Sequence, residues 1–189
     1  MNRHSIHTFF LLIFILSLNA QELPLINKFY PEDYNAESQN WSISQSNNGF
    51  IYVANNKGLL EFNGANWNLY PTPNQTIMRS VKAHESKVFT GFYMDFGFWE
   101  RDEFGVLNYT SLSNLLKVNF LEDEEFWNIL SYDNWILFQS LNRIHMYNTK
   151  TKAYNIIDPD ADISKLIKVR DVFYFQVLNK GLYRIENGE

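Results

Sequence analysis

Histidines are the residues of this chain best suited to acid–base or metal chemistry, and the sequence contains four of them. His4 and His7 lie in the first twenty residues, which have the pattern of a secretory signal peptide. His84 falls in an expected turn and His145 in an expected strand, far apart in the sequence. Because a metal site needs several converging ligands and the chain has no cysteine, we expect no metal and no cofactor.

Acidic residues form two short runs, and each could be taken for a site. Residues 158–162 resemble the start of a calcium loop, but Ile163 and Val169 stand where that loop needs glycine and glutamate. We therefore interpret this run as a solvated turn. Residues 122–125 are expected to form a charged loop between two repeats.

The remaining polar residues do not combine into a catalytic set. Serines are plentiful, yet the sequence has no Gly-x-Ser-x-Gly nucleophile elbow. Neither His84 nor His145 comes with an evident partner that would orient it as a base. We therefore expect a protein that is not an enzyme.

Aromatic residues crowd the segment from Phe92 to Trp99, which also holds Tyr93, Phe96 and Phe98. Aromatic rings at the surface can stack on a sugar or on an apolar ligand. If this segment forms a ligand face, Tyr93 and Trp99 are the candidate ligand-binding residues. The alternative is that the rings pack between sheets, as most apolar residues do in a folded core.

The elements that must position these residues belong to a repeat that returns about four times. Val53, Thr90, Phe138 and Phe175 mark equivalent strand-like runs, with spacings of 37, 48 and 37 residues. Repeats of about 40 residues built from short strands are typical of a β-propeller, with one four-stranded blade per repeat. The sequence predicts an all-β fold over residues 41–189, a partial β-propeller of about four blades whose last blade is incomplete.

Within each repeat, alternation of apolar and polar residues indicates strands, and Asn–Gly pairs indicate the turns between them. The predicted strands are residues 41–46, 50–54, 59–62, 66–70, 79–83, 87–92, 96–99, 105–109, 126–132, 135–140, 143–147, 153–157, 163–169, 172–177 and 182–185. Residues 111–118 fit a short helix and an extended loop equally well. Residues 21–40 are a lead-in, in which Pro24 and Pro31 break regular structure and residues 31–34 form a turn.

The N-terminus predicts export. Arg3 precedes an unbroken apolar run of ten residues that ends shortly before Ala20, so residues 1–20 read as a signal peptide. That run is half as long as a membrane helix requires, and no later run approaches about 20 apolar residues. We expect a periplasmic or secreted mature chain without a transmembrane helix. Its acidic charge, −5 over the whole sequence, disfavours direct contact with nucleic acid.

The first blade resembles a known type of repeat. Residues 43–59 hold a turn with glycine, an aromatic strand and then Gly-Leu, and they look like a two-component regulator propeller repeat. The stretch from residues 31–34 through Trp41 to residues 94–97 resembles the periplasmic sensor portion of a group of Bacteroidetes regulators. In that group the propeller is followed by a triple-tyrosine domain, one membrane helix and a LuxR-type helix-turn-helix.

The resemblance implies a sensory role and an N-terminal fragment, since the output domains of the group have no counterpart in this sequence. We predict a periplasmic ligand-sensing module of a transmembrane transcriptional regulator or sensor, which takes a glycan, another small ligand or a protein partner. A propeller-fold carbohydrate-active enzyme and a purely structural interaction propeller are the alternatives. An unclosed ring leaves open strand edges, so we also predict an isolated chain that is marginally stable or aggregation-prone.

Overall fold

The computed structural model describes residues 24–186, and the predicted signal peptide lies outside this range. Over this range the chain is almost entirely β-structure, which confirms the predicted all-β class. The elements are α2 (Pro31–Tyr34), β1 (Asn40–Gln45), β2 (Ile51–Asn55), β3 (Gly58–Phe62), β4 (Trp67–Tyr70), β5 (Met78–His84), β6 (Lys87–Phe92), β7 (Asp95–Arg101), β8 (Leu107–Ser111), α3 (Leu112–Leu116), β9 (Asn128–Tyr132), β10 (Trp135–Gln139), β11 (Ile144–Asn148), β12 (Tyr154–Ile157), β13 (Ile163–Val169), β14 (Val172–Val177) and β15 (Gly181–Ile185).

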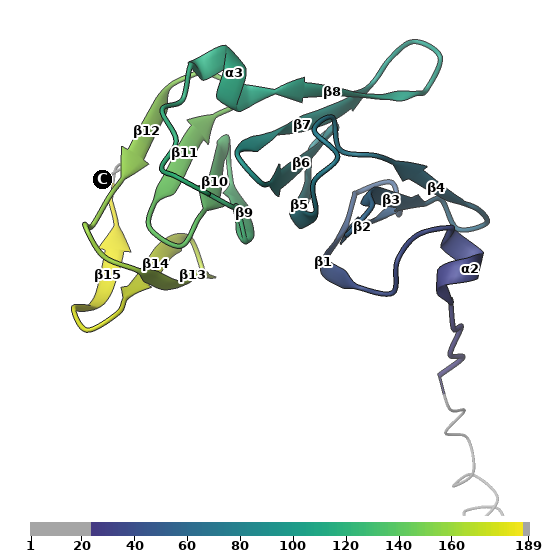
Figure 1. Ribbon diagram of the computed structural model, residues 1–189, viewed down its shortest axis with the longest axis horizontal. Helices are drawn as coiled ribbons and strands as arrows, with labels where there is room; N and C mark the ends of the chain where they lie inside the picture. Colours follow the sequence, from purple (N-terminus) through teal and green to yellow (C-terminus); the bar gives the residue numbers. More distant parts are fainter. Residues whose placement is uncertain (1–23, 187–189) are drawn as a thin grey trace, which may run out of the picture.

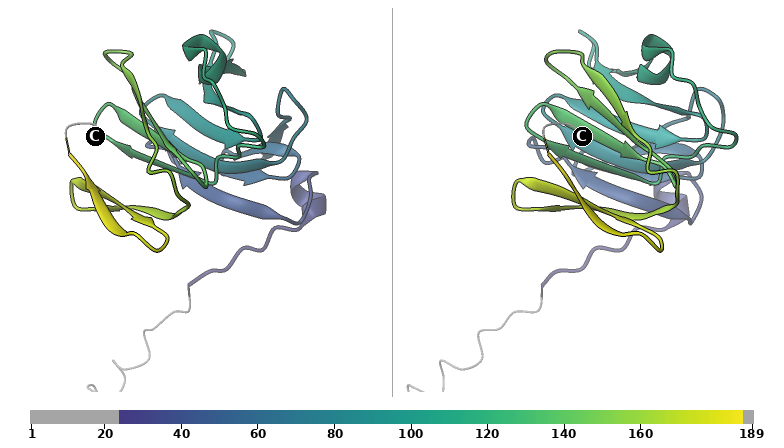
Figure 2. Two further views of the ribbon diagram at one scale, coloured as in Figure 1. Left: turned by 60° about the vertical axis from the view of Figure 1, so that its left-hand side comes forward. Right: turned by 90° about the vertical axis from the view of Figure 1, so that its left-hand side faces the viewer.

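The strands form four antiparallel sheets that follow one another along the chain. The first sheet contains β1–β4, the second β5–β8, the third β9–β12 and the fourth β13–β15. Figure 1 shows the sheets around an arc, with α2 at one end and β15 at the other, and Figure 2 shows them stacked face to face. The arrangement is consistent with consecutive blades of a propeller.

Each predicted strand is present, with ends shifted by two residues or fewer. Short turns account for this agreement, because glycine supplies the backbone conformations that other residues avoid. Gly49 has a φ of +86° in the turn between β1 and β2. Gly58 has a φ of +137°, and a side chain there would collide with the carbonyl oxygen of Tyr70. Turn chemistry therefore fixes where the hairpins of the first sheet lie.

The lead-in differs from its prediction, because residues 31–34 form the helix α2 and not a turn. Pro31 starts this helix, since proline at the first helical position lacks only an N–H that would have no partner there. The carboxylate of Asp33 accepts a hydrogen bond of 2.6 Å from the backbone N–H of Tyr30. Of the two alternatives for residues 111–118, the structure contains the helix. Ser111 caps α3 by accepting a hydrogen bond of 3.1 Å from the N–H of Asn114.

Apolar side chains fill the spaces between neighbouring sheets in three clusters. The two ends of the arc differ. Tyr34 of α2 packs on Val53 and Leu60 and so covers the outer side of the first sheet. The fourth sheet exposes Ile167 and Leu182. Exposed apolar residues of this kind would promote aggregation of the isolated chain, which stays a prediction. Both helices of the described range are only one turn or so long, far too short to cross a membrane.

The innermost strands β1, β5, β9 and β13 contact one another in order. Three of them carry a bulge at the same place, near the start of the strand, where the pairing with the next strand skips Trp41, Arg79 or Ser164. Trp127 takes the corresponding place in the third sheet, directly before β9. Its backbone N–H donates to the carbonyl of Gln139. A bulge bends the strand and re-aims the side chain that it carries. Three bulged side chains, together with that of Trp127, therefore come from one end of the inner strands.

The residue that follows Trp41, Arg79 or Trp127 ties its sheet to the next one. The hydroxyl of Ser42 donates to the carbonyl of Val81 at 3.5 Å, and the hydroxyl of Ser80 donates to the carbonyl of Phe126 at 2.7 Å. The side-chain amide of Asn128 donates to the carbonyl of Leu166 at 3.0 Å. These bonds hold the inner strands side by side.

Candidate functional site

The two residues that the sequence singles out lie in different environments. Trp99 is only 4% exposed and packs in the cluster between the first and second sheets, where its indole N–H donates to Thr90 Oγ1 at 2.9 Å. Trp99 is therefore a core residue, as the packing alternative expects, and it is not on a ligand face. Tyr93 is 36% exposed, and its hydroxyl donates to Asp123 at 2.6 Å. Ligand contact by Tyr93 stays a prediction.

A second group of residues, which the sequence analysis did not single out, lies around two tryptophans at the starts of the inner strands. The rings of Trp41 and Trp127 are 5.9 Å apart and meet edge to face. The guanidinium carbon of Arg79 lies 4.3 Å from the Trp41 ring and 4.5 Å from the Trp127 ring. Glu125 holds the same guanidinium by two hydrogen bonds of 3.3 and 3.4 Å. We call these four residues the inner-strand cluster.

The inner-strand cluster is rigid and yet open to solvent. Trp41 is 41% exposed and Trp127 is 37% exposed. The indole N–H of Trp41 donates to Asn56 at 2.8 Å, which fixes the orientation of its ring. The carboxylate of Glu125 and the two rings together hold Arg79 in place, since cations are attracted to the faces of aromatic rings. The cluster offers flat apolar surfaces at a fixed spacing, which suits stacking on a ligand.

A groove of about 570 Å³ continues from Trp127 between β9 and β13. Side chains from both strands line it, together with one from β10: Trp127, Asn128, Leu130, Gln139, Ser164, Lys165, Leu166, Ile167 and Lys168. The amides of Asn128 and Gln139 are engaged in bonds between the third and fourth sheets, to Leu166 and to the carbonyl of Ile163. The inner-strand cluster and this groove form one continuous surface through Trp127.

Another cleft, of about 380 Å³, lies between the first and second sheets. Most of the charges along it are paired. Lys87 contacts Glu100 at 2.8 Å, and Arg101 forms an ion pair with Glu61, whose side chain is buried. The pair of Arg101 and Glu61 joins the two sheets, whereas Lys87 and Glu100 both belong to the second sheet.

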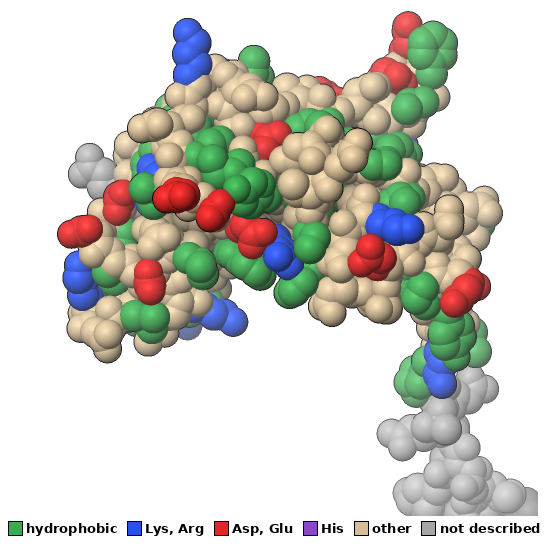
Figure 3. Space-filling model, in the orientation of Figure 1, with side chains coloured by type: hydrophobic (Ala, Val, Ile, Leu, Met, Phe, Trp, Pro, Cys, Tyr) green, Lys and Arg blue, Asp and Glu red, His purple; other side chains and the backbone are tan. Residues whose placement is uncertain are grey.

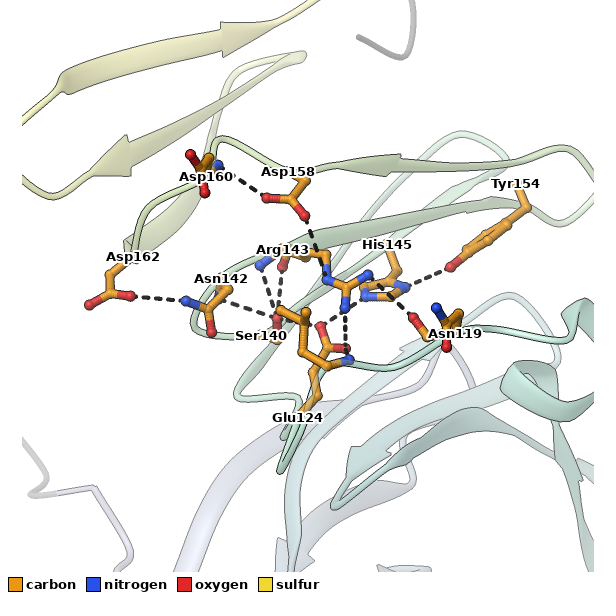
Figure 4. A network of polar contacts seen from close by, with 11 residues as sticks. Asn119, Glu124, Ser140, Asn142, Arg143, His145, Tyr154, Asp158, Asp160 and Asp162 are labelled. Atoms are coloured by element: carbon orange, nitrogen blue, oxygen red, sulfur yellow. Dashed lines mark hydrogen bonds and ion pairs between the residues drawn. The ribbon is translucent and has the colours of Figure 1, made fainter.

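The third sheet encloses a buried polar network around His145 (Figure 4). Nε2 of His145 lies 3.1 Å from Glu124 Oε1, and Nδ1 lies 2.7 Å from the hydroxyl of Tyr154. In the neutral imidazole Nε2 therefore donates, because an ionised carboxylate can only accept. Ser140 donates to the same oxygen of Glu124 at 2.8 Å. Arg143 completes the set, with Nη2 3.4 Å from Glu124 Oε2.

This group, the third-sheet network of Glu124, Ser140, Arg143, His145 and Tyr154, corrects two expectations. Glu124 is buried, although residues 122–125 were expected to form a charged loop between two repeats. His145 does have partners that orient it, Glu124 from a segment 21 residues away and Tyr154 from the neighbouring strand β12. A strand bridge between Tyr93 and Glu125 anchors the acidic run. Neighbouring residues in extended backbone point to opposite sides, so Glu124 points into the sheet and Glu125 points toward Arg79.

The third-sheet network does not have the geometry of a catalytic triad. Ser140 donates to the carboxylate of Glu124 and not to the imidazole, and the histidine is fully buried. Burial alone would raise the pKa of Glu124, but hydrogen bonds from His145 and Ser140 outweigh burial and lower it. Burial raises the pKa of Tyr154, and the charge of Glu124 adds to this effect. The network therefore holds an ionised carboxylate inside the sheet.

The remaining candidates from the sequence are also placed. His84 ends β5 and lies beside Phe89, half-buried. In residues 158–162, Asp158 accepts from the N–H of Asp160 and Asp162 accepts from Asn142, so the carboxylates of this turn serve separate partners. Within residues 24–186, no three histidine, aspartate or glutamate side chains gather as they would around a metal ion.

Neither a family model nor a curated protein matches the chain. Solved structures match in fold. The extracellular domain assigned to a one-component system of Bacteroides thetaiotaomicron gives a TM-score of 0.59 at 17% identity, over 80% of this chain and 21% of that chain. The computationally designed protein Ika4 gives 0.57 at 11% identity, over 88% and 98%. A protein of unknown function from Bacteroides caccae gives 0.51 at 11% identity, over 79% and 61%.

These identities show a shared fold and no more. The chain spans about a fifth of the length of the B. thetaiotaomicron domain that it matches. A second structure that matches similarly, with a TM-score of 0.59, is described as the extracellular domain of a hybrid two-component system from the same organism. The fold of this chain is thus one that extracellular domains of bacterial sensory systems use.

Proposed function

We propose that this chain is a periplasmic sensing module, and that its four sheets are blades of a propeller. The fold shared with extracellular domains of sensory systems supports the proposal, as does the exported N-terminus that the sequence predicts. The ligand contacts the inner-strand cluster and the adjoining groove. The module is part of a transmembrane regulator of the kind that the first repeat resembles, with triple-tyrosine and LuxR-type output domains.

The observation that carries the proposal is the convergence of side chains at one end of the inner strands, two of them at bulges and one directly before β9. Three different sheets contribute Trp41, Arg79 and Trp127, and the two indoles remain more than one-third exposed. Bulges are enriched next to functional sites, because they turn a side chain away from the sheet without breaking the fold. Exposed apolar side chains that lie together, as the rings of Trp41 and Trp127 do, are typical of interaction sites, whereas singly scattered ones are not.

A sensory function fits this surface better than an enzymatic one. The third-sheet network holds the one described histidine with a carboxylate partner, and the imidazole of that histidine is fully buried. The inner-strand cluster lacks the pair of carboxylates that glycoside cleavage uses, since its polar groups are one guanidinium, one carboxylate and two indole N–H groups, and the carboxylate of Glu125 is engaged by Arg79. We take the chain to be a binding module without catalytic activity.

A thermal-shift screen of residues 21–189 against soluble oligosaccharides tests this function. A compound that binds only the folded protein raises the melting temperature by mass action. Trp127→Ala should abolish the shift that any active compound produces. Phe104→Ala is the matched control, because Phe104 is an exposed aromatic residue in the loop between β7 and β8, outside the proposed site. Equal loss of the shift in both variants would contradict the proposed site.

A further inference from the structure

Arg79 has surroundings that no other positive side chain of the described residues shares. Its guanidinium lies against two aromatic rings, 4.3 Å from the centre of Trp41 and 4.5 Å from the centre of Trp127. The other cations of residues 24–186 that lie over a ring each meet one ring. Figure 3 shows a basic side chain flanked by acidic and hydrophobic ones in the middle of the face, near β5 and β9. Several aromatic faces around one positive group are the means by which proteins recognise organic cations.

The rings around this guanidinium have supports of their own. The indole N–H of Trp41 donates to Asn56 at 2.8 Å, and the amide of Asn56 in turn donates to Glu37 at 2.7 Å. The rings of Trp41 and Trp127 also contact each other edge to face. Departure of the guanidinium would therefore leave a preformed space, bounded by two indoles and the carboxylate of Glu125.

Few polar contacts hold the guanidinium of Arg79 in this space. Its two hydrogen bonds to Glu125 are 3.3 and 3.4 Å long, whereas charge-assisted bonds of this kind are usually about 2.7–2.9 Å. Arg101 of the same sheet is held more firmly, since it pairs with Glu61 and also donates to the carbonyl of Gly105 at 2.6 Å. The side chains of Arg79 and Glu125 are 13% and 22% exposed, so solvent reaches the pair. A cation from solution can therefore compete with Arg79 for its place.

The group that fills the space indicates which cation would fit it. Nε and Nη2 of Arg79 both reach the carboxylate of Glu125, while the carbon between them lies close to two rings. A planar fork that pairs with a carboxylate and also stacks on aromatic faces is a property of a guanidinium and not of an ammonium. The net charge of −5 over the whole sequence also favours the approach of a cation over that of an anion.

We propose that the inner-strand cluster binds a ligand through a guanidinium group, and that Arg79 fills this site until the ligand displaces it. The guanidinium of the ligand then contacts the rings of Trp41 and Trp127 and pairs with the carboxylate of Glu125. This inference rests on the proposed function, since it names the ligand class of the same surface. Because Arg79 occupies the site, the measured affinity is the intrinsic affinity reduced by the fraction of molecules in which the site is open.

Calorimetric titration of residues 21–189 with three capped amino acids tests the ligand class. Nα-acetylargininamide carries the guanidinium, its citrulline analogue has nearly the same shape without the charge, and its lysine analogue has the charge without the planar fork. We expect the arginine compound to bind more tightly than the lysine analogue and at least about tenfold more tightly than the citrulline analogue. Methylguanidine separates two sources of the group. It should match the arginine compound if a free guanidino compound suffices, and bind more weakly if the peptide groups of an arginine residue also contact the protein; either result supports the site.

Arg79→Ser tests the displacement, because a competing side chain and a contributing one change the affinity in opposite directions. Serine suits this bulge, since Ser164 holds the equivalent place in the fourth sheet. Removal of a competing Arg79 should tighten binding of the arginine compound at least about fivefold. Lys87→Ser is the matched control and should leave the affinity unchanged. Lys87 also contacts a ring and a carboxylate, those of Phe98 and Glu100, but it meets one ring and lies outside the cluster.

In the Arg79→Ser background, Glu125→Gln should remove most of the preference for arginine over citrulline. Weaker or unchanged binding in Arg79→Ser, or equal binding of the arginine and citrulline compounds, would overturn the inference. The proposed function would stand if a compound of the thermal-shift screen still depends on Trp127. Binding of the arginine compound without any active saccharide would support the function and the inference, since the two share one site. Absence of binding by every compound in both experiments, with natural protein and variants that unfold cooperatively on heating, would overturn both.

Discussion

Two neighbouring carboxylates, Glu124 and Glu125, lie in contrasting parts of the molecule. Glu124 is sealed inside the third sheet, where it accepts hydrogen bonds from His145 and Ser140 and contacts Arg143. Glu125 lies at the inner-strand cluster and holds Arg79 between two exposed indoles. Both pair with arginine beside aromatic rings, yet only one of them is at a surface that a ligand can reach.

The contrast shows that the type of residue does not separate a structural ion pair from a binding site. If residue types alone were considered, Glu124, Arg143 and His145 would look like a functional set. Their burial makes them structural. A charge inside a sheet requires that every partner stays in place, because an unpaired buried charge is costly. At the inner-strand cluster the side chains of Arg79 and Glu125 are 13% and 22% exposed, so this ion pair is less buried than that of Arg143 and Glu124 and should contribute less to stability.

The largest expected effect on stability comes from removing Glu124, the buried carboxylate of the two. Glu124→Ala leaves Arg143 and His145 without their shared carboxylate. We expect a loss of about 3–5 kcal/mol in the free energy of unfolding, the usual cost of removing one partner of a buried pair. Urea denaturation followed by circular dichroism measures this loss. A loss below about 1 kcal/mol would mean that the network is not a stabilising unit.

The stabilisation that Glu124 provides within the third-sheet network should depend on pH. The pKa of Glu124 is lower in the folded protein than its ordinary value, so the unfolded chain takes up a proton first as the pH falls. The stabilisation by Glu124 is therefore complete above its ordinary pKa of about 4.3 and is lost as the pH falls through the lower folded value. Urea midpoints between pH 7 and pH 3 should fall less steeply for Glu124→Gln than for the natural protein. Parallel curves would contradict this assignment.

A smaller effect is expected where one sheet is tied to the next. Ser80→Ala removes a buried hydrogen bond of 2.7 Å to the carbonyl of Phe126, which should cost about 1 kcal/mol. Ser42→Ala is the matched control, because its equivalent bond of 3.5 Å is at the limit of hydrogen-bond length. Thermal unfolding of the two variants should separate them. If Ser42→Ala is the more damaging change, the bond lengths do not reflect the strengths of these contacts.

The smallest effect on stability is expected at the inner-strand cluster. Glu125→Ala frees Arg79 from its carboxylate, while the rings of Trp41 and Trp127 still hold the guanidinium. We expect a loss of no more than about 1 kcal/mol in the free energy of unfolding. The same urea denaturation gives a direct comparison with Glu124→Ala. Equal losses in the two variants would remove the distinction between a sealed network and an open cluster.

The strands were predictable from the sequence because their information is local. Alternation along residues 41–46 and glycine at residue 49 determine a strand and a turn over a few residues. The helix at residues 31–34 was missed because proline both starts and breaks helices, and short segments give no period to decide between them.

The site was largely hidden because its geometry depends on pairing between segments that are distant in the sequence. The bulges at Trp41 and Arg79 appear only once the strand register is known. Glu124 meets Ser140 and His145 only after the third sheet has formed, so an acidic run could not show which of its members is buried. One signal was available for part of the site, since Trp41 opens the first repeat with a large apolar ring.

The central claim is that the ligand binds at the inner-strand cluster and the adjoining groove. Hydrogen–deuterium exchange of residues 21–189, with and without a saturating ligand from the thermal-shift screen, tests it most directly. The ligand should slow exchange in β9 and β13, next to Trp127, and leave β11 and β12 of the third-sheet network unchanged. Protection confined to β11 and β12, or to the cleft between the first and second sheets, would contradict ligand binding at the inner-strand cluster and its groove.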